Sequence, residues 1–147
     1  MYRGISAINL AEKGRIALPT RYREELYAVV VTIDVVENCL LLYPHSEWEE
    51  IEAKIEALPS FNHVARRIQR LLIGHATELS LDNNGRILLP PVLREYAHLE
   101  KQLMLVGQGK KFEIWSATLW AARRKEWLAA GINSSAELPV ELQTISL

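Results

Sequence analysis

Residues 10–23, LAEKGRIALPTRYR, return as residues 81–94, LDNNGRILLPPVLR, without a gap. Seven of the fourteen positions are identical, where ordinary residue usage gives roughly one. The likeness continues downstream, because residues 40–43 with Trp48 correspond to residues 112–115 with Trp120 at an offset one residue longer. The chain is therefore predicted to be built from two copies of one unit.

Each copy predicts the same order of elements. A strand ends at Leu10 or Leu81, and a turn that contains Gly14 or Gly85 reverses the chain, since glycine adopts positive φ without a Cβ penalty. A second strand then runs into a proline, which suits the first turn of a short helix. The further strands are expected at residues 15–18, 29–35 and 40–43 in the first copy, and at residues 86–89, 103–106 and 112–115 in the second.

Helices are expected after the strands of each copy. The short ones cover residues 19–26 and 90–97, and longer ones start at Ser46, in a capping box with Glu49, at Asn62 and at Ser116. Gly74 and Gly131 are expected to end the last two. The apolar side chains that these helices are expected to bury are Trp48, Ile51, Ile55, Val64, Ile68, Leu71, Leu72, Leu119, Trp120 and Trp127. Residues 132–147 are interpreted as a frayed tail or an arm that packs on a neighbouring subunit.

Length and composition favour one shared core. A unit of about 70 residues is only marginally stable alone, so the repeats 1–76 and 77–147 are expected to share a core, which the 49% apolar content can fill. Lys and Arg (17) nearly balance Asp and Glu (18), for a formal net charge of −1, so a nucleic-acid partner requires a local basic patch. No apolar run is long enough to span a membrane, and the start lacks the order of a signal peptide, so a cytosolic protein is expected.

The sequence shows little sign of catalysis or metal binding. A Gly-x-Ser-x-Gly elbow is missing, and the single cysteine, Cys39, is interpreted as a buried strand residue. His45, His63, His75 and His98 lack ligand spacing and are interpreted as surface or helix-end residues. The glycines of residues 107–111, GQGKK, indicate a hairpin turn and not a phosphate loop. We therefore expect neither an enzyme nor a bound metal or cofactor.

The repeated Gly-Arg pair is the strongest functional signal. Arg15 and Arg86 each follow the turn glycine at the expected hairpin tip, and Lys13 adds a cation beside Arg15. A guanidinium group binds two acceptors at once, from a phosphate or from guanine, and a β-hairpin fits a DNA major groove. Alternatively, the arginines pair with neighbouring carboxylates and only rigidify their turns.

Several motifs resemble the MraZ family over nearly the whole chain. They are the Asp-x-x-x-Arg turn from Asp82 to Arg86, Lys13-Gly14-Arg15, Met1-Tyr2-Arg3-Gly4, Leu41-Leu42-Tyr43-Pro44, Arg66-Arg67-Ile68-Gln69-Arg70 and Met104-Leu105-Val106-Gly107. The resemblance implies an α+β, mainly β, fold: a pseudo-twofold, AbrB-like swapped-hairpin barrel made from the two repeats, with flanking helices. It further implies a cytoplasmic, nucleoid-associated bacterial transcriptional regulator, which assembles as a homo-oligomeric ring on direct repeats of double-stranded DNA. Those repeats lie in the promoter of the division and cell-wall gene cluster that begins with its own gene.

The family motif implies roles for particular residues. DNA contacts fall on Arg15, Arg86, Lys13 and Asn84, whereas Asp82, Gly14 and Gly85 structure the turns. Ala11 stands where the first Asp is expected, which removes an Asx turn and leaves the Arg15 turn less preorganised. An oligomeric scaffold that binds an acidic protein partner is the alternative, and competition by unrelated duplex DNA distinguishes the two. A barrel enzyme that uses paired carboxylates is a third reading, with no such pair evident in the sequence.

Overall fold

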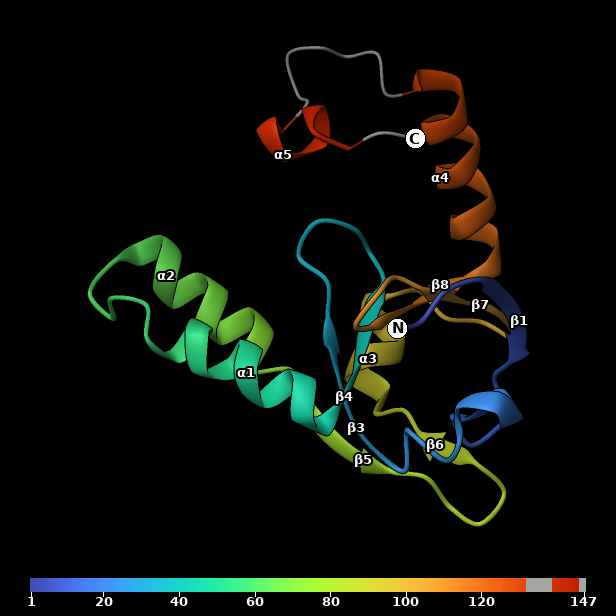
Figure 1. Ribbon diagram of the computed structural model, residues 1–147. Coiled ribbons are helices and arrows are strands. Elements are labelled where there is room, and N and C mark those ends of the chain that lie inside the picture. Colours follow the sequence, from blue (N-terminus) through green and yellow to red (C-terminus); the bar gives the residue numbers. More distant parts are fainter. Residues whose placement is uncertain (132–138, 146–147) are drawn as a thin grey trace. The chain divides into compact units, whose positions relative to one another are not determined.

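The strands of the two repeats alternate within one sheet. The structure, a computed structural model, describes residues 1–131 and 139–145, and the chain divides into two units, Met1–Ala117 and Thr118–Leu147. In the first unit the main sheet has the strand order β1-β7-β8-β4-β3-β5, with all neighbours antiparallel (Figure 1). Its strands are β1 (Ile5–Asn9), β3 (Ala28–Ile33), β4 (Leu40–Pro44), β5 (Thr77–Ser80), β7 (Gln102–Gly107) and β8 (Phe112–Ser116).

This strand order reads the same when the two repeats are exchanged. The β3–β4 and β7–β8 hairpins are equivalent and meet at the β4–β8 pair, while β1 joins β7 and β5 joins β3 across the repeats. The remaining strands, β2 (Arg15–Ala17) and β6 (Arg86–Leu88), pair with each other in a separate two-stranded ribbon. The predicted α+β class, mainly strands from two intertwined repeats, is confirmed.

The ribbon closes the main hydrophobic core. Ile16 and Ile87, at the centre of its two strands, are 0% and 1% exposed and pack with apolar residues of the main sheet. Residues after each ribbon strand join the same core, among them Leu18 and Leu89. Each turn that precedes a ribbon strand is therefore followed directly by residues that are buried in the core, and this burial fixes the C-terminal end of the turn.

A helical pair forms a second hydrophobic cluster. Helix α1 (His45–Glu56) lies beside α2 (His63–Ile68) and its π-helical continuation η2 (Gln69–Ile73), as Figure 1 shows. Their apolar side chains pack with alternate residues of β3 and β4, so these strands are buried on both faces, as their continuous apolar runs suggest. The buried or packed residues include the predicted Trp48, Ile51, Ile55, Ile68 and Leu72, while Leu71 packs against the main core.

Strand β3 is shorter than predicted. It ends at Ile33, and Val35 and Val36 are 47% and 82% exposed, so the expected extension to residue 35 is wrong. The Asp34 carboxylate accepts the N–H groups of Val36 (3.4 Å) and Glu37 (3.1 Å). This Asx-type turn stops the strand before its apolar run ends.

Three helix predictions also need correction. Helix α1 begins at His45 after Pro44, without a side-chain cap bond, so the Ser46 capping box is wrong; the fixed φ of Pro44 places the helix start one residue earlier. Val64 is exposed and not part of an apolar face, although Asn62 does cap α2. The expected helix at 19–26 is only a 3₁₀ turn, η1 (Thr20–Tyr22), whereas α3 (Pro91–Tyr96) has the preorganised Pro91 at its first position.

The second unit is helical in its described residues. Helix α4 (Ala117–Ala130) directly follows Ser116, and α5 (Val140–Gln143) is a short helix within the predicted tail. No side chain of α4 is buried, and Trp127 is 41% exposed, so its predicted core role is wrong. Trp127 stacks edge-to-face on Trp120 at 5.8 Å between ring centroids instead. Residues 132–138 and 146–147 of the tail lie outside the described residues.

Candidate nucleic-acid interface

The ribbon of β2 and β6 presents both repeated arginines on one face. Arg15 lies opposite Leu88, and Ala17 lies opposite Arg86. Because side chains alternate along a strand, the two arginines share the outer face, while Ile16 and Ile87 face the core. Ordinary strand dimensions put the Cα atoms of the two arginines about 8 Å apart across this face.

Each arginine directly follows the glycine of its turn, as predicted, and Leu10 and Ile16 form an antiparallel bridge across the first turn; the longer strand pairing, however, runs between the repeats. Each arginine is the first residue of a ribbon strand, and β2 pairs with β6 of the other repeat while β1 pairs with β7. Local hydrogen bonds nevertheless close each turn, with Ala11 N–H donating to Arg15 O (2.8 Å) and Asp82 N–H to Arg86 O (2.9 Å). The two turns thus share one backbone pattern, and both end in a glycine of positive φ, +88° at Gly14 and +71° at Gly85.

Asp82 organises the second turn with its side chain. One carboxylate oxygen accepts the N–H groups of Asn84 and Arg86, both at 2.9 Å, and the other accepts Arg86 Nε–H at 3.0 Å. The backbone bond from Arg86, supported by the other two contacts, lowers the pKa of Asp82. The predicted Asx turn is therefore present, and it aims the Arg86 side chain.

The first turn has the same backbone but lacks this side-chain support, because Ala11 carries no acceptor. Within the described residues no carboxylate lies within 4.0 Å of the Arg15 guanidinium, whereas Arg86 pairs with Asp82. The alternative in which the arginine pairs with a neighbouring carboxylate therefore holds for Arg86 and not for Arg15. Lys13 and Asn84, the other predicted contact residues, are exposed in their turns.

Two further arginines border the turns and were missed as site residues. Arg23 lies against Gly85, and Arg94 lies against Gly14, so each arginine contacts the turn of the opposite repeat. Their identity was visible in the aligned repeats, at the last matching position. The sequence did not show that these arginines contact the turns of the opposite repeat, because that contact depends on the pairing of β2 with β6.

Comparison with known proteins agrees with this repeated architecture. The family described as "MraZ protein, putative antitoxin-like" matches the chain twice, at residues 1–71 and 72–137. The chain belongs to the MraZ family. It is 55% identical to proteins named transcriptional regulator MraZ from Coxiella burnetii and Legionella pneumophila, and 52% identical to one from Halorhodospira halophila. Each comparison covers 100% of this chain and 100% of the relative.

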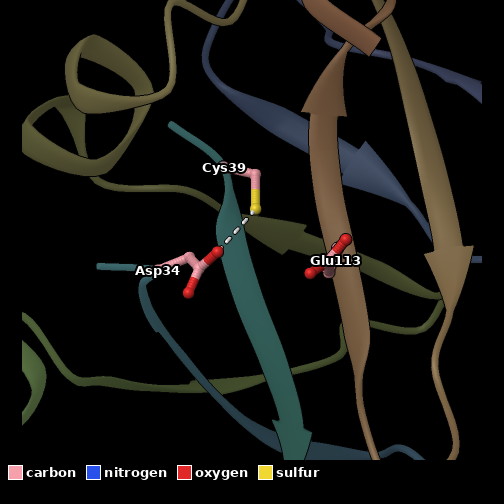
Figure 2. A group of neighbouring side chains, drawn as sticks. All are labelled: Asp34, Cys39 and Glu113. Atoms are coloured by element: carbon pink, nitrogen blue, oxygen red, sulfur yellow. Dashed lines mark hydrogen bonds between the residues drawn. The ribbon is translucent and has the colours of Figure 1, made fainter. Parts of the chain in front are cut away.

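This MraZ family member also brings three donor groups together away from the ribbon. Figure 2 shows Cys39 beside Asp34, with Glu113 on the neighbouring strand β8, and their donor atoms lie within 4.8 Å of one another. Such a set could supply ligands to a metal ion, which the sequence did not suggest. Burial raises the pKa of the Cys39 thiol, with Glu113 and Asp34 adding to the effect, and the thiol donates to Asp34 (3.6 Å). It therefore keeps its proton at neutral pH.

The other predicted local features are mostly as expected. Cys39 is buried, although it ends the β3–β4 turn and does not lie within a strand. Residues 108–111 form the β7–β8 turn, with Gln108 N–H donating to Lys111 O (2.9 Å). His45 and His63 begin helices, and His98 follows α3. Among the helices of residues 1–131 and 139–145, none has both the length and the apolar character that crossing a bilayer requires.

Proposed function

We propose that this MraZ family member is a transcriptional regulator that binds duplex DNA through the outer face of the β2–β6 ribbon. One observation carries the proposal: Arg15 and Arg86, from different repeats, share that face. Their Cα separation of about 8 Å is smaller than the major groove width of about 12 Å. A single ribbon can therefore direct both guanidinium groups into one groove. The names of the relatives support regulation as the purpose of this contact.

The two arginines contribute differently to this contact. Arg86 uses Nε–H to bind Asp82, which leaves its terminal N–H groups to bind a phosphate or the O6 and N7 acceptors of guanine. Arg15 has no carboxylate partner in the described residues and offers its whole guanidinium group. Lys13 and Asn84 are exposed beside them and add a cation and an amide for backbone contacts.

Binding by one chain is weak in this proposal, because the chain has a net charge of −1 and few cations on the ribbon. We propose that several chains assemble as a ring and engage direct repeats in the promoter of the division and cell-wall cluster. Multivalency then raises affinity without new contacts. In each chain the strands of the two repeats share one core, and in this proposal the protein acts in the cytoplasm on the nucleoid.

A gel-shift titration with the protein's own upstream DNA tests the ribbon contact. Truncating Arg15 or Arg86 to Ala removes about 1–3 kcal/mol per base contact, or about 5- to 150-fold in Kd. Arg66→Ala is the matched control, since Arg66 is an exposed arginine on α2, away from the ribbon. Unchanged binding by the Arg15→Ala, Arg86→Ala double variant refutes the proposal.

The same titration, with probes that carry different numbers of repeats, tests the proposed ring. Affinity should climb steeply with the number of correctly spaced repeats on the probe. Equal affinity for one repeat and for three, or sedimentation as a monomer with full affinity, contradicts the ring. Competition with unrelated duplex DNA tests the scaffold alternative. A scaffold for an acidic protein partner would release the promoter probe to unrelated DNA as readily as to promoter DNA, whereas a sequence-specific regulator would keep the promoter probe bound.

A further inference from the structure

Arg23 and Arg94 occupy equivalent places in the two repeats and make equivalent hydrogen bonds. Arg23 Nε–H donates to Leu18 O (2.9 Å), and Arg94 Nε–H donates to Leu89 O (3.0 Å). Both side chains are half-buried. Each guanidinium group is therefore anchored just beyond the end of its own ribbon strand.

From this anchor each guanidinium covers the turn of the opposite repeat. A Cβ atom placed on Gly85 would lie 2.2 Å from Arg23 Nε, and one placed on Gly14 would lie 2.9 Å from Arg94 Cζ and Nε. The backbone makes the same crossing, because Leu18 N–H donates to Gly85 O (3.0 Å) and Leu89 N–H donates to Gly14 O (2.9 Å). Each turn glycine thus accepts a leucine N–H through its carbonyl oxygen and lies against an arginine side chain, both from the other repeat, and both glycines are buried.

We propose that Arg23 and Arg94 are positioning residues for the DNA contact, Arg23 acting through Arg86 and Arg94 acting through Arg15. This inference rests on the proposed function of the ribbon. Each arginine fixes the glycine that immediately precedes the contact arginine of the other repeat, so it sets the direction in which that contact arginine leaves the backbone. Specificity in one repeat's turn then depends on a side chain of the other repeat.

The surroundings of Arg94 favour positioning over a direct phosphate contact. Arg94 lines a surface hollow with Glu95 and Glu100, and a second one with Glu12, Glu100 and Lys101, so carboxylates outnumber the lysine around it. These carboxylates repel a phosphate that approaches Arg94, although none lies within 4.0 Å of its guanidinium in the described part of the chain. Arg94 is therefore suited to hold the turn while Arg15 faces the DNA.

The two clamps do not carry equal weight. The second turn is also held by the three hydrogen bonds of the Asp82 carboxylate, whereas Ala11 gives the first turn none. Loss of Arg23 leaves a turn that is still braced, but loss of Arg94 leaves the first turn with backbone bonds alone. Arg94→Gln should therefore weaken DNA binding more than Arg23→Gln.

Crossed double-mutant cycles on DNA affinity test this assignment. We expect Arg94→Gln to raise Kd about three- to tenfold in the wild-type chain and by less than about twofold in the Arg15→Ala background. In the Arg86→Ala background its effect should persist in full, because that pair is uncoupled. The Arg23 cycle should show the reverse preference, with coupling to Arg86 and additivity with Arg15→Ala. Arg66→Gln serves as the charge-matched control and should leave Kd within about twofold.

The salt dependence separates positioning from direct contact. If Arg94 itself contacts a phosphate, Arg94→Gln in the Arg15→Ala background should reduce the magnitude of the slope of log K against log salt by about one. If Arg94 is a positioning residue, the same substitution should leave that slope unchanged. Hydrogen exchange in the DNA-free protein gives a second readout: Arg23→Gln should speed exchange of the Leu18 N–H, and Arg94→Gln that of the Leu89 N–H. If a glutamine variant does not fold, Arg→Lys at the same position keeps the charge but loses the planar clamp and enters the same cycles.

The outcomes distinguish this inference from the proposed function. If Arg15→Ala and Arg86→Ala each weaken binding but all cycles are additive, the ribbon binds DNA and the positioning roles are wrong. If neither alanine variant weakens binding, the proposed function falls and takes the inference with it. Coupling of Arg94 to Arg86 in place of Arg15, or unchanged exchange at Leu18 and Leu89, also overturns it.

Discussion

Gly85→Ala tests the contact between the repeats independently of DNA. Gly85 has φ +71°, and an added Cβ would lie 2.2 Å from Arg23 Nε and 2.4 Å from Cδ. The left-handed backbone alone costs an alanine about 1–2 kcal/mol. Displacing Arg23 also removes its bond to Leu18 O, a part-buried charged hydrogen bond that we count at about 1–2 kcal/mol.

The expected total is therefore about 2–4 kcal/mol, or a fall in Tm of about 4–16 °C for a chain of this size. Gly4→Ala is the matched control, because Gly4 has φ +90° and no atom within 4 Å of its added Cβ. It should cost only the backbone part, about 1–2 kcal/mol. Thermal unfolding followed by circular dichroism measures both variants.

An Arg23→Ala background removes the obstacle, so there Gly85→Ala should cost no more than Gly4→Ala does. If Gly85→Ala is as mild as Gly4→Ala in the wild-type chain, the arginine does not press on the turn. If its larger cost survives in the Arg23→Ala background, the cost has another origin. Either result refutes the clamp as described.

Four further predictions concern the turns, the buried cysteine and the β1–β7 edge of the sheet. Asp82→Ala should lower Tm at neutral pH, because the Asp82 carboxylate accepts hydrogen bonds that stabilise its turn. The folded state lowers the pKa of Asp82, so this stabilisation is complete above an ordinary aspartate pKa of about 3.9 and is lost as the pH falls through the pKa of the folded state. The difference in Tm between the variant and the wild-type chain should therefore vanish in acid. Ala11→Asp should raise Tm and leave DNA affinity equal or higher, and a fall in Tm would contradict the Asx-turn role. Native Cys39 should resist iodoacetamide and react only on unfolding, as mass spectrometry can show, because its thiol is buried and its pKa is raised. Gly107→Ala should cost about 1–3 kcal/mol in thermal unfolding, since its Cβ would meet Arg3 backbone atoms at 2.4–2.7 Å.

Much of the fold follows from patterns that the sequence displays locally. The repeated Gly-Arg turn, the apolar runs of β3 and β4 and the tryptophan-bearing α1 are each visible within a few residues. The end of β3 was not predicted, because the apolar run continues through Val36 while Asp34 binds the following N–H groups. Asp34 itself was the available signal, as a turn-forming residue inside that run.

The pairing of β2 with β6 lies beyond local patterns. Each strand has three residues with one inward isoleucine, so neither pattern distinguishes its own hairpin partner from the equivalent strand of the other repeat. The choice is made by the shared core, which Ile16 and Ile87 enter together. The sequence correctly predicts that Arg15 and Arg86 each follow a turn glycine, and Arg86 is exposed while Arg15 is half-buried. Their common face and the positions of Arg23 and Arg94 depend on the pairing of β2 with β6, which the sequence does not display.

The exchange of strands also explains how the first turn tolerates Ala11. In an isolated hairpin, loss of the aspartate would leave residues 11–14 with only their own backbone bonds. Here Gly14 O accepts Leu89 N–H, and Arg94 covers the glycine from the other repeat. Because these supports come from residues 89 and 94, a substitution at residue 11 does not remove them. The two turns can therefore differ in sequence, one braced by its own carboxylate and the other chiefly by its partner repeat, while both keep an arginine on the same face of the ribbon.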